Sequence, residues 1–573
     1  MLRLFPYAKN YRKEIILGPT FKFLEAVFEL FLPLLMARLV DQGIQQQNWT
    51  VIWQMTFWMI LASITGLLFA ITCQYFSSIA SQGFGTELRN QLMEKINRLS
   101  HRELNYFGSN TLITRLTNDI NQMQLALAMV IRLVVRAPFL SIGALIMAFY
   151  IDWQIGLIFL AILPIFSLLL FLLIRFSVPL FRLVQQQLDR LNQLVAQNLS
   201  GVRIIRAFNR QEREVDKFQQ QSDALNETYL KVTKLSIILS PLTTLVLNLG
   251  IIGIFMIGGF KVELGHLQQG EVLALVNYMN QMLLALIVVS NLVIIFTRAE
   301  ASAKRINEVF DLPISLSERD EPTTPRQVRG EIIFNQVNFR YSPEHGRALR
   351  KVSFQIPAGA FLGITGPTGS GKSTLTQLIP RFYDIDTGEI LVDGVNIKDW
   401  PLDYLRRQIA FVPQKSVLIR GTIRENLQWG KETATDADCW QALELAQGAE
   451  FVRLLPDQLD TLIVEGGKNF SGGQIQRLAI ARALIAQPKI LVLDDSLSAL
   501  DYQTDWLLRQ NLRKIPATVL LISQRVSSIQ EADQILVLEK GRVVGLGSHL
   551  DLLQQVPYYQ EIVHAQEEGE ANA

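Results

Sequence analysis

The most specific motif of the chain is Phe361-Leu362-Gly363-Ile364-Thr365-Gly366-Pro367-Thr368-Gly369-Ser370-Gly371-Lys372-Ser373-Thr374. Its first five residues predict a buried strand, and a helix is expected to follow the glycine-rich loop. The glycines let backbone N–H groups surround phosphate oxygens, and the helix N-terminus adds partial positive charge. Lys372 can reach the β- and γ-phosphates, and Ser373 can ligate Mg2+. The motif therefore predicts a phosphate-binding loop in an α/β domain.

Further short Val/Ile-rich strands follow between helices, at Ile409–Val412, Ile490–Leu493 and Val519–Ile522. The second of these strands ends in two carboxylates, Asp494 and Asp495. We expect the strand to deliver acidic side chains to a nucleotide-bound Mg2+. The α/β domain is predicted to occupy residues 330–573.

Composition indicates that the rest of the chain lies in a membrane. The 573 residues are 49% hydrophobic and only 18% charged, with a mean hydropathy of +0.22, whereas soluble domains average ~25% charged residues. A net charge of +2 gives no support for a nucleic-acid partner. Cys73 and Cys439 lie in different halves, which fits a reducing compartment and excludes a disulfide framework. The first ten residues do not resemble a removable signal peptide.

About six apolar segments are long enough to cross a bilayer, which takes ~20 residues each. We place them at Ile15–Gln45, Val51–Ser81, Leu125–Ile151, Ile155–Phe176, Ile237–Phe260 and Val272–Thr297. The N-terminal arm and the connections after the second and fourth segments are rich in Lys and Arg, while the other hairpins are short and nearly free of them. This asymmetry predicts a multi-pass protein with both termini in the cytoplasm.

The basic connections after the second and fourth segments are predicted to be helices that continue beyond the membrane as long hairpins. Two small cytoplasmic subdomains are the alternative. Residues 311–329 contain Pro313, Pro322 and Pro325 and are predicted to form an exposed linker. The membrane domain is thus expected at residues 1–310. The fold class is an α-helical transmembrane domain with six helices, fused to an α/β P-loop ATPase domain.

The motifs around the phosphate loop resemble the ATPase domain of ABC transporters, across its whole length. Phe470-Ser471-Gly472-Gly473-Gln474 followed by Ile475-Gln476-Arg477 resembles the ABC signature, with Phe where Leu is usual. The resemblance implies ATP and Mg2+ as cofactors and assigns site residues by motif. Adenine and phosphates would be bound by Tyr341, Gly366, Thr368, Gly369, Ser370, Gly371, Lys372, Ser373 and Thr374. Mg2+ would be held by Ser373, Gln414 and Asp494. Ser471, Gly472, Gly473 and Gln474 would contact nucleotide held by a partner domain, and Ser498 and Asp501 would lie in the loop that crosses the dimer seam.

Besides Phe470, the sequence departs from the family pattern at three places. Asp495 replaces the catalytic Glu that orients the attacking water and is one methylene shorter, and positioning errors near 1 Å can cost ~100-fold in rate. Gln524 replaces a His that contacts the γ-phosphate, and it cannot carry charge or transfer a proton. Val464-Glu465-Gly466-Gly467 replaces Gly-Glu-Arg-Gly before the signature. With Gln414, Asp495 and Gln524 form the predicted catalytic set of an impaired ATP site; full activity despite both substitutions is the alternative.

The membrane half resembles the six-helix exporter type, at the level of layout. The resemblance implies short coupling helices near Tyr106–Thr114 and Ala207–Asp216, the second of which meets a partner subunit. Lys22, Glu25 and Glu29 share one face of the first apolar segment, and ionisable groups in a membrane usually face a cavity or a partner. Glu25, Glu29, Asn280 and Asn291 are candidate substrate contacts. A Lys22–Glu25 pair, or pairing with Arg132 or Arg136, is the alternative.

These features together predict the degenerate-site half of a heterodimeric exporter in a bacterial cell membrane, resembling multidrug exporters that move amphipathic small molecules. Its partner would be a second half-transporter with a complete catalytic site. A homodimer with two impaired sites, a lipid or peptide exporter, and an ATP-gated channel or channel regulator remain as alternatives.

Overall fold

The computed structural model describes residues 1–316, 318, 321–325, 327–344 and 346–571. Within these ranges the side chains at positions 2, 173–174, 177–178, 235–236, 239–240, 290–291, 294 and 568–571 are left out of the description. The predicted linker 311–329 therefore falls partly outside the described residues. The chain forms two compact units, one of Met1–Asn97 and Ser109–Leu312, the other of Arg98–Gly108 and Pro313–Ala573.

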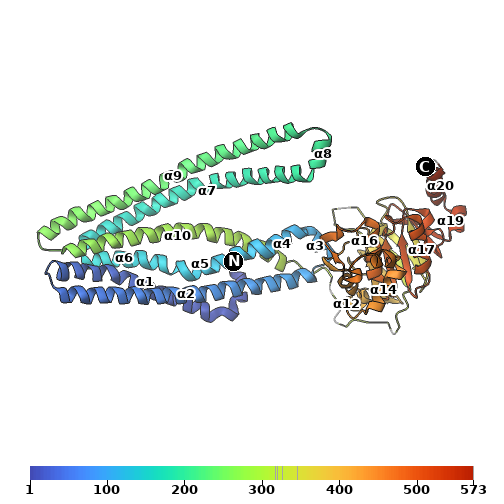
Figure 1. Cartoon of the computed structure of the whole chain (residues 1–573), viewed down its shortest axis with the longest axis horizontal. Coiled ribbons are helices and arrows are strands. Elements are labelled where there is room, and N and C mark those ends of the chain that lie inside the picture. The colour runs from blue at the N-terminus through green and yellow to red at the C-terminus, as the bar shows by residue number, and fades with distance from the viewer. Residues whose placement is uncertain (317, 319–320, 326, 345, 572–573) are drawn as a thin grey trace. The chain divides into compact units, whose positions relative to one another are not determined.

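The first unit consists of helices. They are η1 (Leu2–Tyr11), α1 (Arg12–Arg38), η2 (Leu39–Ile44), α2 (Trp49–Arg98), α4 (Ser109–Thr114), η3 (Arg115–Asp119), α5 (Ile120–Met129), η4 (Val130–Val134), α6 (Arg136–Ile151), α7 (Trp153–Ser200), α8 (Val202–Ala207), α9 (Gln211–Glu263) and α10 (Gln269–Phe310). With 50, 48 and 53 residues, α2, α7 and α9 confirm the prediction of long continuous helices over small subdomains. In Figure 1, α7 and α9 run side by side and α8 joins them at one end.

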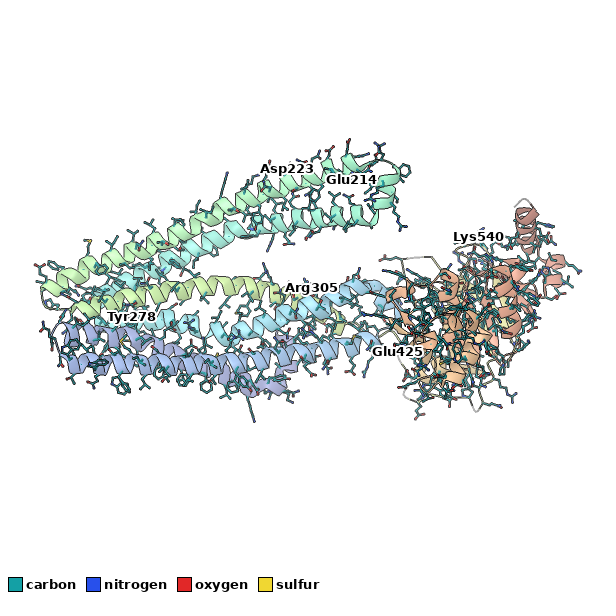
Figure 2. The ribbon with its side chains drawn as sticks, viewed as in Figure 1. Glu214, Asp223, Tyr278, Arg305, Glu425 and Lys540 are labelled. Atoms are coloured by element: carbon teal, nitrogen blue, oxygen red, sulfur yellow. The ribbon has the colours of Figure 1, made fainter. Side chains whose placement is uncertain are left out.

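Polar side chains mark where the long helices begin and how they are tied together. Asp152 ends α6 and starts α7, since its carboxylate accepts hydrogen bonds from the N–H groups of Gln154 and Ile155 at 2.9 and 3.0 Å. Tyr278 on α10 (Figure 2) is fully buried and donates to the carbonyl oxygen of Leu30 on α1 at 2.6 Å. Such a bond satisfies a polar group that would otherwise be stranded among apolar neighbours.

Five helices in the described part of the chain are long and apolar enough to cross a membrane. They lie within Trp49–Arg98, Ser109–Ile151, Trp153–Leu172, Pro241–Glu263 and Gln269–Val289. The first segment expected from the sequence is a helix, α1, but Lys22, Glu25 and Glu29 interrupt its apolar run. A sixth crossing by α1 therefore stays a prediction.

The second unit is an α/β domain. Its strands are β1 (Ile332–Phe339), β2 (Leu349–Ile356), β3 (Phe361–Thr365), β4 (Thr387–Val392), β5 (Val395–Asn396), β6 (Ile409–Val412), β7 (Gly421–Thr422), β8 (Leu462–Ile463), β9 (Ile490–Asp494), β10 (Thr518–Ile522), β11 (Gln534–Glu539) and β12 (Arg542–Gly547). Its helices include α11 (Lys372–Leu378), α12 (Leu402–Arg407), α13 (Ile423–Gln428), α14 (Asp436–Leu445), α15 (Ala449–Arg453), α16 (Gly472–Leu484), α17 (Tyr502–Leu512), α18 (Val526–Ile529), α19 (His549–Gln555) and α20 (Pro557–Ala571).

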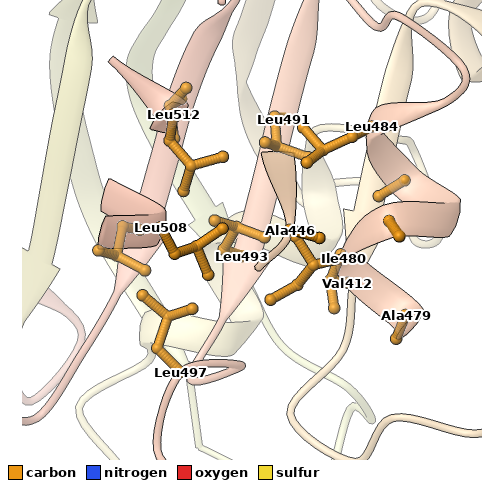
Figure 3. Packing of buried hydrophobic residues seen from close by; sticks show 14 of the residues in the cluster. Val412, Ala446, Ala479, Ile480, Leu484, Leu491, Leu493, Leu497, Leu508 and Leu512 are labelled. Atoms are coloured by element: carbon orange, nitrogen blue, oxygen red, sulfur yellow. The ribbon is translucent and has the colours of Figure 1, made fainter. Parts of the chain in front are cut away.

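The central sheet has the order β12-β11-β3-β10-β9-β6, with the five strands from β11 to β6 parallel. Side chains alternate between its faces. Leu491 and Leu493 of β9 enter one apolar cluster with helices α16 and α17 (Figure 3), and Ile490 and Val492 enter another. Because the strands are parallel, the carboxyl ends of β3, β9 and β10 meet at one edge, where parallel α/β sheets bind ligands.

Short helices lie at or beside the two segments expected to be coupling helices, with α4 inside the predicted Tyr106–Thr114. Helix α3 (His101–Phe107) precedes the predicted Tyr106–Thr114 and belongs to the second unit, where Asn105 donates to the hydroxyl of Tyr383 at 3.0 Å. Ser100 begins α3 with a capping box, in which its hydroxyl pairs with Glu103. Helix α8 likewise ends where the predicted segment 207–216 begins. That these segments act as coupling helices stays a prediction.

Candidate nucleotide site

A pocket of about 350 Å3 lies at the carboxyl edge of the central sheet. It is lined by Tyr341, Ala348, Thr368, Gly369, Gly371, Lys372, Ser373, Thr374, Gln414, Asp494, Asp495, Ile522 and Gln524. The sequence motifs named eleven of these thirteen positions, all except Ala348 and Ile522. Gly366 and Ser370, also predicted to bind nucleotide, are absent from the lining and lie in the loop behind it. The site thus gathers residues separated by up to 183 positions, from Tyr341 to Gln524.

The phosphate loop is shaped by close backbone contacts. Gly366 has φ of +142°, and a Cβ there would lie 2.1 Å from the carbonyl oxygen of Leu538, so only glycine fits. Lys372 begins α11 and folds back over the loop, where its Nζ donates to the carbonyl oxygens of Gly366 and Pro367 at 2.7 and 2.9 Å. Burial lowers the pKa of Lys372 below the ordinary lysine value. An anionic ligand would offset this cost and favour the ammonium.

Two observations show that the loop fits a nucleotide. Gly369 and Gly371 line the pocket with φ of +82° and +102°, and such left-handed residues in a turn let successive backbone N–H groups form an anion-binding concavity. Tyr341 lines the same pocket, and its hydroxyl is 3.0 Å from that of Thr374. Its ring is 40% exposed and therefore available for stacking.

Asp494 and Ser373 form a pair of oxygen donors suited to Mg2+. The Ser373 hydroxyl donates to Oδ1 of Asp494 at 2.9 Å. Asp494 is only 3% exposed, and burial raises its pKa above the ordinary aspartate value. Hydroxyl, carboxylate and amide oxygens suit Mg2+, which binds through few protein groups together with nucleotide phosphates. Ser373 and Asp494, with Gln414 in the same lining, would hold the ion, whose charge would neutralise phosphate oxygens.

Asp495 has an unusual backbone conformation. Its φ is +48°, in the left-handed region, where Asp is more frequent than longer side chains. Its N–H donates to the carbonyl oxygen of Ile522 at 3.1 Å, and its Oδ2 accepts from Nε2 of Gln414 at 3.2 Å. Burial raises the pKa of Asp495 above the ordinary value, partly offset by the bond from Gln414. The short carboxylate is therefore held beside the loop glutamine, in a backbone conformation that favours Asp over Glu.

Gln524 lines the same pocket with an exposed side chain. Its main-chain oxygen accepts a hydrogen bond from Nε2 of Gln566 at 2.6 Å. Gln566 lies 42 residues further along and belongs to no motif, so sequence reasoning did not identify it. No sequence signal marks such a contact, because it depends on how the C-terminal helix docks.

The predicted signature residues Ser471, Gly472, Gly473 and Gln474 are absent from the pocket lining. They start helix α16, where Ser471 and Gln474 form a capping box with bonds of 2.9 and 3.3 Å. Ser471 and Gly472 are exposed. This helix N-terminus is therefore free to approach an anion that comes from outside the chain.

The predicted seam loop is also outside the lining. Ser498 donates to the carbonyl oxygen of Asp495 at 2.9 Å, so this loop is hydrogen-bonded to the end of β9. Asp501 is exposed and caps α17 by accepting from the N–H of Thr504 at 2.9 Å.

The candidate substrate residues in the first unit are engaged in ion pairs and hydrogen bonds. Lys22 and Glu25 pair at 2.6 Å, and Arg136 pairs with Glu29 at 2.8 Å, both as in the alternative stated from the sequence. Glu29, Arg136 and Gln281 line a second pocket of about 160 Å3 with apolar side chains. Asn280 is absent from this lining and donates to a carbonyl of its own helix. The side chain of Asn291 lies outside the described residues.

The phosphate loop, the strand-end carboxylates and the apolar helices define a membrane protein with a P-loop ATPase domain. Comparison with known families identifies it further. The family described as the ABC transporter transmembrane region matches residues 15–286, and the ABC transporter family matches residues 349–498. The chain belongs to the ABC transporter family and is an ATP-driven transporter of the exporter fold.

Similar proteins cover nearly the whole chain. An uncharacterized ABC transporter ATP-binding protein, YfiB of Bacillus subtilis, is 38% identical and covers 95% of this chain and 94% of its own length. An ATP-dependent lipid A-core flippase of Desulfotalea psychrophila is 33% identical over 84% of each chain. The structure of a bacterial Atm1-family ABC exporter with ATP bound has a TM-score of 0.82 at 25% identity, covering 97% of this chain and 99% of the other.

Proposed function

We propose that this chain is the degenerate-site half of a heterodimeric exporter that moves amphipathic small molecules, including drugs, out of a bacterial cell. The observation that carries the proposal is the composition of one pocket. The residues for phosphate and Mg2+, namely Lys372, Ser373 and Asp494, are complete there, while Asp495 and Gln524 depart from the family at the positions that act on water and the γ-phosphate. Phosphoryl transfer depends on water positioning and charge stabilisation, so both departures weaken the same step.

A partner subunit is supported by surfaces that this chain leaves uncovered. The signature helix lies outside the chain's own pocket, as expected if it completes a partner's site. Helix α8 and its flanks expose large apolar side chains, with Ile204 65% and Phe208 74% exposed. Apolar side chains at an exposed helical turn fit a contact with a second ATPase domain. The partner's site, with Glu and His at the matching positions, would hydrolyse most of the ATP.

The decisive experiment compares ATP turnover by the purified chain alone and by the chain co-expressed with its partner. We expect slow turnover by the chain alone and robust, substrate-stimulated turnover by the pair. Removing the partner's catalytic Glu should abolish turnover of the pair, whereas Asp495→Asn in this chain should change it little. Robust turnover by the chain alone would overturn the heterodimer proposal and favour a homodimer.

Orientation and location belong to the same proposal. Both termini and the turn helix α8 would lie in the cytoplasm of a bacterial cell, on the side where ATP is available. Support comes from the basic residues that cluster in the N-terminal arm and in the two long helical hairpins. Labelling single introduced cysteines at Ser109 and Asn209 from outside intact cells should fail, and should succeed in inverted vesicles.

Substrate contact is proposed for the pocket around Glu29. This carboxylate and Arg136 are each 30% exposed, and they lie among Leu133, Leu140 and Leu284. An ion pair inside an apolar pocket favours ligands that combine an apolar body with a charge. Glu29→Gln should reduce export of cationic amphiphiles and leave neutral ones unchanged, with Glu25→Gln as the matched control on the same helix. Equal losses for both substrate classes would exclude a charge-selective role.

Lipid transport is the second candidate, favoured by the 33% identity to a protein named as a lipid A-core flippase. The two candidates differ in a measurable way. Purified complex in vesicles would be tested for ATP-dependent movement of a fluorescent lipid between leaflets and for uptake of a cationic dye into inverted vesicles. Lipid movement without dye uptake would replace the multidrug proposal. An ATP-gated ion current in the same vesicles would point instead to a channel.

A further inference from the structure

The C-terminal helix α20 presents one face to the nucleotide-binding domain. Tyr559, Val563 and Gln566 are spaced four and three residues apart, so they lie on the same side of the helix. Tyr559 is fully buried and its hydroxyl is 2.8 Å from Nδ1 of His549, and Val563 joins the same apolar cluster. These two anchors fix the rotation and height of α20, so the position of Gln566 one turn later is also fixed.

Gln566 binds the loop that carries Gln524. Its Nε2 donates to the carbonyl oxygen of Gln524 at 2.6 Å, and its Oε1 accepts from the N–H of Val526 at 2.8 Å. The amide group of Gln566 thus pairs with one main-chain acceptor before Arg525 and one main-chain donor after it, as the backbone of a neighbouring strand would. The N–H of Arg525 donates to the hydroxyl of Ser523 at 3.0 Å, which further restrains this turn. The backbone of Gln524 is held from behind, while its side chain lines the nucleotide pocket.

We infer that Gln566 is a positioning residue for recognition of the γ-phosphate, because it fixes the backbone from which Gln524 reaches into the pocket. A neutral amide binds the γ-phosphate only through a hydrogen bond, which requires a short distance and a suitable angle. Gln524 therefore depends on a fixed backbone more than a charged residue would. The C-terminal helix thereby becomes part of the nucleotide site. This inference rests on the proposed contact between residue 524 and the γ-phosphate and is independent of the heterodimer.

The test measures the affinity of the full-length protein for Mg-ATP and Mg-ADP by displacement of a fluorescent nucleotide. Gln566→Met keeps the size of the side chain and removes both hydrogen bonds. We expect about a tenfold loss of ATP affinity, which corresponds to ~1.4 kcal/mol, and an unchanged affinity for ADP. Gln566→Glu keeps the acceptor for Val526 but places a carboxylate oxygen against the carbonyl of Gln524, so its loss should be at least as large.

The matched control is Gln560→Met on the same helix. Gln560 donates to the carbonyl oxygen of Leu553 in α19, so this substitution disturbs helix docking without touching the loop. The ratio of ATP to ADP affinity should stay at the wild-type value. If Gln560→Met lowers the ratio as much as Gln566→Met does, docking of the helix is what matters and the inference fails.

A double-mutant cycle separates a positioning role from an independent one. If Gln566 acts through Gln524, the variant with both Gln524→Ala and Gln566→Met should lose no more ATP affinity than Gln524→Ala alone. Additive losses, or equal losses for ATP and ADP, would overturn the inference. Because the measurement is of binding, it holds whether or not this site hydrolyses ATP. The heterodimer proposal has a different test, since rapid ATP hydrolysis by the chain alone would contradict it.

Discussion

The two sides of the nucleotide pocket, one lined by residues for phosphate and Mg2+ and the other by residues expected to act on water, differ in how far their side chains are buried in the domain core. On the phosphate side, Lys372 and Asp494 are 8% and 3% exposed and belong to the helix and strand that form the domain core. On the hydrolytic side, Gln414 and Gln524 are exposed, and Asp495 follows the end of its strand. The residues expected to bind phosphate and Mg2+ are thus part of the folded core, whereas those proposed to act on water lie at its margin. This difference supports the proposal of a site that binds nucleotide and hydrolyses it slowly.

The largest expected effect comes from the phosphate side. Lys372→Ala removes the ammonium group that the loop holds through Gly366 and Pro367. Truncating a buried, hydrogen-bonded charge costs ~2–5 kcal/mol, so ATP affinity should fall by roughly 30-fold or more. Equilibrium binding of a fluorescent ATP analogue to the full-length protein would measure this loss.

The control for Lys372→Ala is Lys398→Ala, at a position outside the pocket lining in the same domain. It should bind ATP as the wild type does. If Lys372→Ala also bound ATP with unchanged affinity, the contrast between the two sides of the pocket would be lost.

The next effect concerns the hydrolytic side. Asp495→Glu restores the longer carboxylate and should raise the ATP turnover of the chain alone, with about 100-fold as the upper limit for correcting a ~1 Å error. The left-handed backbone at residue 495, with φ of +48°, disfavours Glu and reduces the gain. Adding Gln524→His should increase turnover further, because both positions act on one step. Steady-state phosphate release at saturating Mg-ATP is the measurement.

Asp495→Asn serves as the comparison for Asp495→Glu. Asparagine tolerates the same backbone conformation and has the same length, but it cannot act on the attacking water. No gain in turnover is expected from it. A rise equal to that of Asp495→Glu would mean that side-chain length and charge at this position do not limit hydrolysis.

The phosphate side was predictable from the sequence because its residues are close in the chain or end neighbouring strands. The motif 366–374 fixes a loop geometry locally, and parallel β3, β9 and β10 bring Thr368, Asp494 and Gln524 to one edge. Contacts made by docked helices were not predictable. The bonds from Gln566 to the loop, and the placement of α3 in the second unit, depend on packing between segments far apart in sequence. The ion pair of Glu29 with Arg136 was foreseen only as one of several pairings, since periodicity places residues on faces without choosing partners.

A smaller effect should appear in stability. The raised pKa of Asp494 means that the folded protein disfavours its charged form, so this group lowers stability increasingly as the pH rises from the ordinary value of 3.8 through its folded pKa. Below the ordinary value of 3.8 both states are protonated and the cost disappears. Without nucleotide and Mg2+, Asp494→Asn should raise Tm at pH 7 by about 2 °C, as expected for ~1 kcal/mol. The difference should shrink toward acidic pH, and thermal unfolding followed by fluorescence would measure it.

The smallest effect is expected for Gln524→His without nucleotide. The Gln524 side chain is exposed, and the hydrogen bond from Gln566 of α20 goes to the main-chain oxygen of Gln524, so the substitution leaves this bond in place. Exposed substitutions away from special features usually change stability by less than ~0.5 kcal/mol, and Tm should stay within about 2 °C of the wild type. With Mg-ATP present, the same variant should gain stability in proportion to its tighter binding of the γ-phosphate. A large loss of Tm without nucleotide would mean that the hydrolytic side is constrained by folding as strongly as the phosphate side.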